Sequence, residues 1–216
     1  MKSSKKHFIF SFFSFVSFVL WTILIQCVDV KPIGVNDTNV GLATLNGFVH
    51  ALTGVNMNLY IITDWLGLVP VFVCLSFGVL GFIQLIKRRN LSKVDFDILI
   101  LGLYYVIVIV CYLLFEMIPI NYRPILINGF MEVSYPSSTT LLVLSVMPTL
   151  SFQTKYRCKN KVIINFVLIF TIVFSVFMVV GRLISGVHWI TDIVGSLFLS
   201  AGLFYSYKFV VLIKND

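Results

Sequence analysis

The chain has 216 residues, of which 59% are hydrophobic and only 12% are charged, and its mean hydropathy is +1.00. Soluble domains are closer to half apolar and a quarter charged, so this composition excludes an ordinary soluble protein and indicates an integral membrane protein. The net charge of +7 does not indicate a nucleic-acid partner, because the basic residues separate hydrophobic runs instead of forming one basic face.

Six hydrophobic runs have about the length that a helix needs to cross a bilayer. The first follows a basic N-terminal segment, but its length and the lack of a small-residue cleavage site favour a retained anchor helix over a cleaved signal peptide. The sequence therefore predicts an all-α fold and a single domain over residues 1–216. Its six transmembrane helices are expected at about 8–28, 65–86, 98–118, 133–154, 162–181 and 190–213.

The distribution of basic residues predicts the orientation of these helices. Thirteen of the 16 Lys and Arg residues lie in one alternating set of segments, and the other set holds only Lys31, Arg123 and Arg182. Cytoplasmic loops are enriched in Lys and Arg, so both termini are expected in the cytoplasm of a multi-pass plasma membrane protein. The short loops and the residue usage favour a bacterial source.

The first outer loop, residues 29–64, is expected to contain an amphipathic helix. Apolar residues recur there at spacings of three and four, which predicts a helix that lies on the membrane surface or covers the end of the bundle: Leu42, Leu45, Phe48, Val49, Leu52 and Val55. His50 is expected on the polar face of this helix.

The second outer loop carries Arg123-Pro124 and ends at the start of the fourth predicted helix with Pro136-Ser137-Ser138-Thr139-Thr140. Proline and hydroxyl residues at a helix start are typical of an N-terminal cap. The same free N–H groups bind phosphate oxygens, so this segment is either a simple cap or an anion site. Arg123 and Arg182 oppose the charge rule on the outer side, which indicates either a shared anionic ligand or two side chains that only reach the interface.

The third outer loop places Arg182, His188 and Asp192 close together in the sequence. His188 and Asp192 are four residues apart, so they share one face of a helix and can form a hydrogen bond. A carboxylate on one imidazole nitrogen fixes the tautomer and leaves the other nitrogen free as a base or nucleophile. This pattern predicts a catalytic site with a phosphate-binding arginine beside it.

The three outer loops resemble the type 2 phosphatidic acid phosphatase (PAP2) superfamily, which includes the vanadium haloperoxidases. Its pattern consists of Lys-x6-Arg-Pro, Pro-Ser-Gly-His and Ser-Arg-x5-His-x3-Asp, and the third part is matched at Arg182, His188 and Asp192, with Gly181 in place of Ser. The resemblance implies that His188 attacks phosphorus, that Asp192 orients it and that Arg123 and Arg182 hold the phosphoryl oxygens. Ser137, Ser138 and nearby N–H groups would cap the phosphate. The implied mechanism needs no metal ion or other cofactor.

Two positions depart from the family pattern. Glu116 stands where the family has Lys, and Thr139 stands where the family has the His that protonates the leaving oxygen. General acid catalysis contributes roughly 10²–10⁴ in rate, and a hydroxyl of very high pKa is a poor acid. Four residues are candidates for a substitute acid: Glu116, Glu132, His50 and Thr139.

The sequence thus predicts a phosphatase that acts on a lipid phosphate or diphosphate, of the isoprenoid diphosphate or phosphatidate type, at the extracytoplasmic face. The expected partners are this lipid and the bilayer. The alternative is a catalytically impaired relative that binds phosphorylated lipid without efficient turnover, which the substitutions at Glu116 and Thr139 would explain. A small transporter is disfavoured, because that class places charges at mid-bilayer depth and nearly all charges here lie at helix ends.

Overall fold

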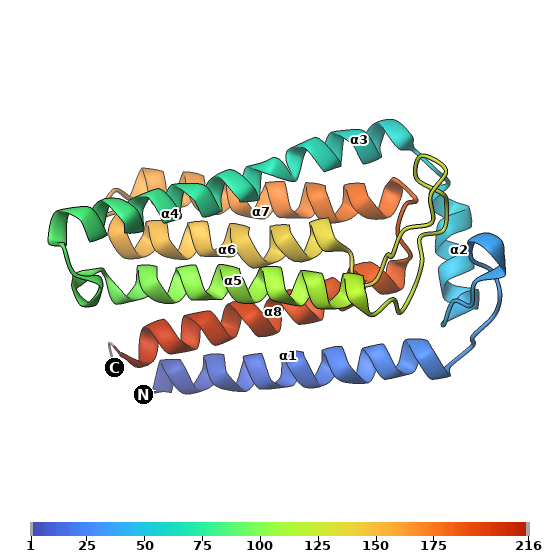
Figure 1. Ribbon diagram of the computed structural model, residues 1–216, viewed down its shortest axis with the longest axis horizontal. Coiled ribbons are helices and arrows are strands. Elements are labelled where there is room, and N and C mark those ends of the chain that lie inside the picture. Colours follow the sequence, from blue (N-terminus) through green and yellow to red (C-terminus); the bar gives the residue numbers. More distant parts are fainter. Residues whose placement is uncertain (1, 215–216) are drawn as a thin grey trace.

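The computed structural model describes residues 2–214, and all its regular elements are helices (Figure 1). Long helices run side by side along the molecule, and the shorter α2 crosses one end of the bundle. The α-helices are α1 Lys2–Cys27, α2 Ala43–Thr53, α3 Met57–Leu66, α4 Leu68–Arg88, α5 Phe96–Met117, α6 Ser138–Arg157, α7 Lys161–Ile184 and α8 Ile190–Ile213. Two single 3₁₀ turns, η1 Val35–Asp37 and η2 Leu91–Lys93, lie in the loops.

Helix α1 packs along α8, so the two ends of the described chain lie together at one end of the bundle (Figure 1). The α1–α3, α5–α6 and α7–α8 connections lie at the opposite end, together with α2. This arrangement places the three predicted outer loops at one end of the molecule, and we name it the outer end after that prediction.

Within residues 2–214, five segments are long and apolar enough to cross a membrane: Ser4–Cys27, Met57–Arg88, Phe96–Met117, Lys161–Ile184 and Ile190–Ile213. The predicted fourth span, α6, is not among them, although its 20 residues correspond to a length of about 30 Å. Helix α6 packs against α4, α5, α7 and α8. Its low hydropathy follows from this central position, because a helix surrounded by other helices does not need an apolar surface toward lipid. That α6 crosses the membrane as one of six spanning helices stays a prediction.

Polar side chains on α6 are fully buried, and they bond to neighbouring helices. The Tyr105 hydroxyl lies 2.7 Å from the Thr149 hydroxyl, and Gln153 donates a hydrogen bond of 2.7 Å to the Tyr207 hydroxyl. Burying any of these polar groups in an apolar interior without its hydrogen-bond partner would lower the stability of the fold. These bonds fix how α6 is oriented relative to α5 and α8.

The predicted second helix begins eight residues too late. Residues 57–64 were assigned to the first outer loop, whereas α3 begins at Met57 and continues into α4 at Gly67. The side chain of Asn56 caps α3 by accepting a hydrogen bond of 3.0 Å from the Leu59 N–H. Asp64, near the end of α3, forms an ion pair with Arg182 of α7.

The fourth predicted helix begins five residues later than expected, at Ser138. Residues before it form an extended segment in which Tyr122 pairs with Val133 in an isolated antiparallel bridge. The Arg123 N–H donates to the Glu132 carbonyl, and the Ser134 N–H donates to the Asn121 carbonyl. Pro136, which follows a cis peptide bond, cannot donate a helical hydrogen bond, so the helix starts after it. The α5–α6 connection is therefore an ordered hairpin at the outer end.

A helix is present in the first outer loop, and its exposed side is apolar. Leu45, Phe48 and Leu52 of α2 are exposed, whereas Asn46 is fully buried. The face of α2 that contacts the bundle is therefore the polar one. The membrane-surface location predicted for this helix stays a prediction.

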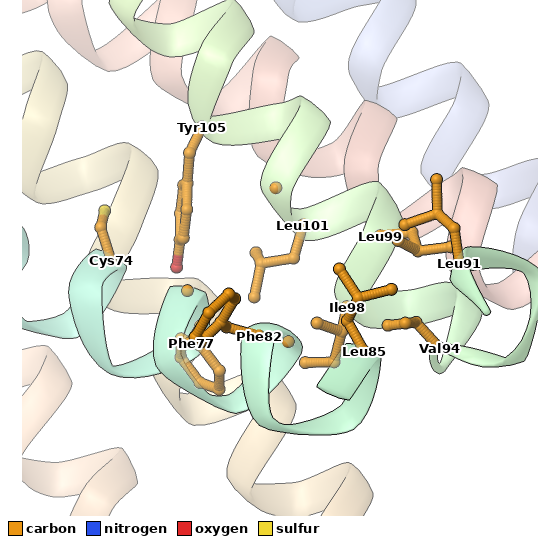
Figure 2. A pocket seen from close by; sticks show the side chains of 13 residues that line it. Cys74, Phe77, Phe82, Leu85, Leu91, Val94, Ile98, Leu99, Leu101 and Tyr105 are labelled. Atoms are coloured by element: carbon orange, nitrogen blue, oxygen red, sulfur yellow. The ribbon is translucent and has the colours of Figure 1, made fainter. Parts of the chain in front are cut away.

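A pocket of about 320 Å³ separates α4 from α5 toward the end that holds the termini (Figure 2). Its lining is almost entirely apolar, with Phe77, Phe82 and Leu85 from α4 and Ile98 and Leu101 from α5. A second pocket of about 460 Å³ lies between α4, α5 and α6 toward the outer end. Together the two pockets mark a loosely packed seam between α4 and α5.

Candidate active site

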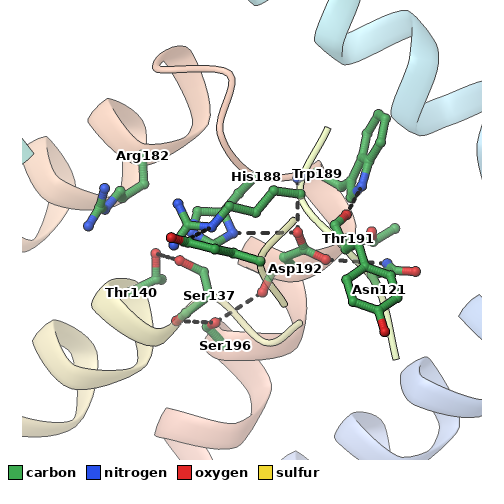
Figure 3. Close-up of polar contacts among 12 residues, drawn as sticks. Asn121, Ser137, Thr140, Arg182, His188, Trp189, Thr191, Asp192 and Ser196 are labelled. Carbon is green, nitrogen blue, oxygen red and sulfur yellow. Dashed lines mark hydrogen bonds and ion pairs between the residues drawn. The ribbon is translucent and has the colours of Figure 1, made fainter. Parts of the chain in front are cut away.

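Residues from three separate segments meet at the outer end of the bundle (Figure 3). Arg123 comes from the α5–α6 connection, Arg182 from the last turn of α7 and His188 from the short α7–α8 connection. Asp192 lies in the first turn of α8. The structure therefore brings together the four residues that the sequence placed in one phosphate site.

His188 lies beside the carboxylate predicted to orient it. Its Nδ1 is 3.5 Å from Asp192 Oδ2, and both side chains are almost completely buried. The other contacts of Asp192 hold the carboxylate in place. Oδ2 accepts a hydrogen bond of 3.0 Å from the Trp189 N–H, and Oδ1 accepts one of 3.3 Å from the Asn121 side-chain amide (Figure 3). Asp192 is thus anchored to the backbone at the start of α8 and to the second outer loop.

Burial lowers the pKa of His188 from its usual 6.5 to about 4. The Asp192 carboxylate beside Nδ1 raises the pKa, whereas the positive charges of Arg123 and Arg182 lower it. An imidazole in this environment is neutral at physiological pH. Nε2 has no hydrogen-bond partner among residues 2–214, so it keeps its lone pair available for a ligand.

The two guanidinium groups are also buried. Arg123 is 9% exposed and Arg182 is 2% exposed, and both guanidinium carbons lie over the ring of Tyr60, at 5.7 and 5.0 Å from its centroid. Within the described residues, Nη1 of Arg123 and both Nε and Nη1 of Arg182 have no hydrogen-bond or ion-pair partner. Buried donors without acceptors are costly in a folded protein, so this cluster is suited to an anion with several oxygen atoms.

The start of α6 is bonded to α8. The Ser137 N–H donates to the Asp192 carbonyl at 3.2 Å, its hydroxyl donates to the Thr140 hydroxyl at 3.0 Å, and the Ser196 hydroxyl donates to the Ser137 carbonyl at 2.9 Å. These groups of Ser137 are therefore used within the protein, and the residue fixes the position of α6 relative to Asp192. The neighbouring Ser138 lines the pocket of about 460 Å³.

The four candidates for a substitute acid lie at different distances from the arginines. Thr139 accepts a hydrogen bond from Arg182 Nη2, and Glu132 Oε2 lies 3.1 Å from Arg123 Nε. Glu116 is exposed near the end of α5. The Nε2 of His50 lies 3.2 Å from the Gly186 carbonyl oxygen, and its ring packs against Trp189. Thr139 and Glu132 are thus the candidates in direct contact with the guanidinium groups.

Three residues of the cluster were not identified from the sequence. Asp64 pairs with Arg182, Tyr60 contacts both arginines and Asn121 holds Asp192. Tyr60 and Asp64 are four residues apart, which would have indicated a shared helical face if residues 57–64 had been recognised as helical. No pattern in the sequence connects Asn121 with Asp192. Among the described residues, no three His, Cys, Asp or Glu side chains lie close enough together to hold a metal ion.

The helical fold and the five long apolar segments are those of a multi-pass membrane protein. Residues 111–214 match the model of the PAP2 superfamily, which confirms the resemblance inferred from the sequence. The matched part of the chain includes Arg123, Arg182, His188 and Asp192.

A solved structure supports the same fold over almost the whole chain. It is described as the first transmembrane PAP2 type phosphatidylglycerolphosphate phosphatase from Bacillus subtilis. The two chains are 18% identical and superpose with a TM-score of 0.62, over 96% of this chain and 98% of that chain. No curated protein matches the sequence. At this identity the similarity establishes the fold alone.

Proposed function

We propose that this protein is a phosphatase that removes a terminal phosphate from a membrane lipid at the extracytoplasmic face. The observation that carries the proposal is the cluster of buried nitrogen atoms without partners on Arg123, Arg182 and His188. Two guanidinium groups are suited to bind a phosphoryl group, and a neutral imidazole beside them is suited to attack it. The match of residues 111–214 to the PAP2 superfamily supports the same class of reaction.

The lipid nature of the substrate is supported by the pocket of about 460 Å³ beside the cluster. Asp64, Ser138 and Thr139 line its polar end, and its remaining lining is mostly apolar, with residues such as Leu68 and Leu142. A lipid could therefore place its phosphate at the arginines and the start of its hydrocarbon chain between α4 and α5. Both isoprenoid diphosphates and phosphatidate-type lipids fit this description.

The proposed reaction has two steps. The lone pair of His188 Nε2 forms a bond to phosphorus, the bond from phosphorus to the lipid oxygen breaks, and the lipid oxygen takes up a proton. Water then attacks the phosphohistidine, the bond between nitrogen and phosphorus breaks, and inorganic phosphate leaves. Arg123 and Arg182 stabilise the charge on the phosphoryl oxygens in both transition states. Asp192 stabilises the positive charge that His188 acquires as it forms the intermediate.

The source of the leaving-group proton distinguishes an efficient enzyme from an impaired one. Thr139 occupies the position of the family's acid and contacts Arg182 through its hydroxyl oxygen. A diphosphate leaving group needs little protonation, so a diphosphate substrate would make the missing acid less important. This argument favours a lipid diphosphate as substrate. The alternative function is binding of phosphorylated lipid without efficient turnover.

Phosphate release from purified protein tests the proposal. The detergent-solubilised protein is supplied with a lipid phosphate and a lipid diphosphate in the presence of EDTA, and His188→Ala is compared with the wild type. We expect the variant to lose activity by at least about a thousandfold, since loss of a catalytic nucleophile has effects of this size. Equal phosphate release from both proteins would contradict the proposed mechanism.

A second variant separates the two functions. If the wild type binds a lipid phosphate but releases phosphate slowly, Thr139→His should raise the rate, because it restores an acid at the leaving group. An unchanged low rate in this variant would favour binding without turnover as the function of the wild type.

A further inference from the structure

Each guanidinium group of the cluster is paired with a carboxylate from the rim of the site. Arg182 Nη2 lies 2.8 Å from Asp64 Oδ1, and Arg123 Nε lies 3.1 Å from Glu132 Oε2. The arginine side chains are 2% and 10% exposed, whereas those of Asp64 and Glu132 are 60% and 41% exposed. In both ion pairs an exposed carboxylate therefore contacts a buried guanidinium group.

Of the two ion pairs, the one between Asp64 of α3 and Arg182 is the shorter. Tyr60 and Asp64 lie one turn apart on α3, so the same helical face supplies the ring under both guanidinium groups and the carboxylate on Arg182. Asp64 and Thr139 bond to the same nitrogen, Nη2. Nε and Nη1 of Arg182 have no such partner among the described residues.

Asp64 is attached to the site through this one ion pair and is otherwise largely exposed. It also lines the pocket of about 460 Å³, so its side chain has space on the side away from the arginine. A carboxylate in this position can leave Arg182 without disturbing a packed core. The guanidinium group, in contrast, is fixed by burial and by its contact with Tyr60.

We propose that Asp64 is an internal competing anion of this site: it occupies Arg182, and a phosphoryl group must displace it in order to bind. This inference rests on the proposed phosphate site. It adds the requirement that a ligand bind Arg182 strongly enough to displace Asp64. The site faces a bilayer whose phosphodiester head groups each carry one negative charge, whereas a terminal phosphate or diphosphate carries more. Because the attraction between charges grows with their product, a dianion overcomes the competing carboxylate more readily than a phosphodiester does. Asp64 thus keeps the arginines from being occupied by ordinary phospholipids.

The test is the affinity of the detergent-solubilised full chain for inorganic phosphate, measured by titration calorimetry at a pH where phosphate is a dianion. Asp64→Asn removes the charge and keeps the size of the side chain. We expect the dissociation constant for phosphate to fall by about fivefold or more, which corresponds to the loss of one partly screened charge near the ligand. Dimethyl phosphate, a soluble phosphodiester, should also gain affinity in this variant.

Two control variants distinguish this effect from a general change in charge or shape. Asp64→Glu keeps the charge and should bind phosphate about as the wild type does. Asp37→Asn removes one negative charge from an exposed turn of the same outer segment and should leave the affinity unchanged. If Asp64→Asn does not yield monodisperse protein, Asp64→Ser, which is smaller and also neutral, takes its place.

An unchanged or weaker phosphate affinity in the neutral variant would overturn the proposal, because it would make the ion pair a structural contact that does not compete with ligand. Failure of both neutral variants to fold, or a wild type that binds no phosphate at all, would overturn it as well. The measurement involves no turnover. A wild type that binds phosphate more weakly than Asp64→Asn but hydrolyses no lipid would support this inference and contradict the proposed phosphatase activity.

Discussion

At the scale of single residues, the site is defined by what surrounds His188. Burial and two neighbouring guanidinium groups keep the imidazole neutral, and Asp192 keeps one of its nitrogens oriented. The sequence identified His188, Asp192, Arg123 and Arg182 because the PAP2 pattern fixes their types and spacing. It did not identify Asp64 or Tyr60, because their relation to the arginines depends on how α3 lies against α7.

The protonation of His188 as a function of pH tests this description of its environment. The pKa of its ring in the folded protein is lowered to about 4, so the ring should stay neutral as the pH falls through 6.5 and take up its proton only near pH 4. NMR of the histidine-labelled protein measures this, with the His188 signal assigned by its loss in His188→Gln. A midpoint near 6.5 would contradict the buried environment described here.

The same shift has a consequence for stability. The unfolded chain binds a proton on this histidine at a pKa near 6.5, whereas the folded protein does so only near 4. Stability from this group is therefore fully present above about pH 6.5 and decreases as the pH falls toward 4, because the unfolded state binds more protons in that range.

At the scale of elements, α2 supports the loop that carries His188. Asn46 of α2 is completely buried, and its side-chain amide donates a hydrogen bond of 3.0 Å to the Thr191 hydroxyl and accepts one of 3.3 Å from the Thr191 N–H. His50, one turn later, contacts the Gly186 carbonyl and the Trp189 ring. The polar face of α2 thus holds both ends of the α7–α8 connection.

Asn46→Ala should therefore affect both stability and turnover. The change leaves buried groups of Thr191 without partners, which costs about 1–3 kcal/mol. We expect a lower midpoint of thermal unfolding and about a tenfold lower turnover number, because Thr191 precedes Asp192 directly. Thr53→Ala on the same helix is the control, since its hydroxyl bonds mainly to carbonyl groups of its own helix and to that of Gly54. Equal turnover in both variants would show that α2 does not position the loop.

At the scale of the whole molecule, a pocket between α4, α5 and α6 reaches from the site to the exposed apolar side of α5. The pocket of about 460 Å³ begins at Asp64 and Thr139 and includes Ile109, an exposed residue of α5. A seam in this place could admit the chain of a lipid from the side of the bundle. We expect this pocket to bind the hydrocarbon chain because the proposed substrate is a lipid.

Ile109→Trp should fill part of this pocket without disturbing the core. We expect it to raise the Michaelis constant for a long-chain lipid phosphate severalfold and to leave hydrolysis of a short, water-soluble phosphate ester unchanged. Ile107→Trp, at another exposed position of α5 outside the pocket, is the matched control. If both variants lower activity on the lipid equally, the seam has no specific role in binding the chain.

The sequence by itself determined the membrane class, the places of most helices and the types of the site residues, because hydropathy, charge and motif spacing are local properties of the chain. Tertiary structure decided the rest. The low hydropathy of α6 is explained by its central position, and the pairing of Asp64 with Arg182, which are 118 residues apart, depends on how α3 lies against α7. The ion pairs of Arg182 with Asp64 and of Arg123 with Glu132 form because separate segments pack together. Electrostatic balance in a buried site depends on which charges meet in space, and spacing along the chain does not contain this information.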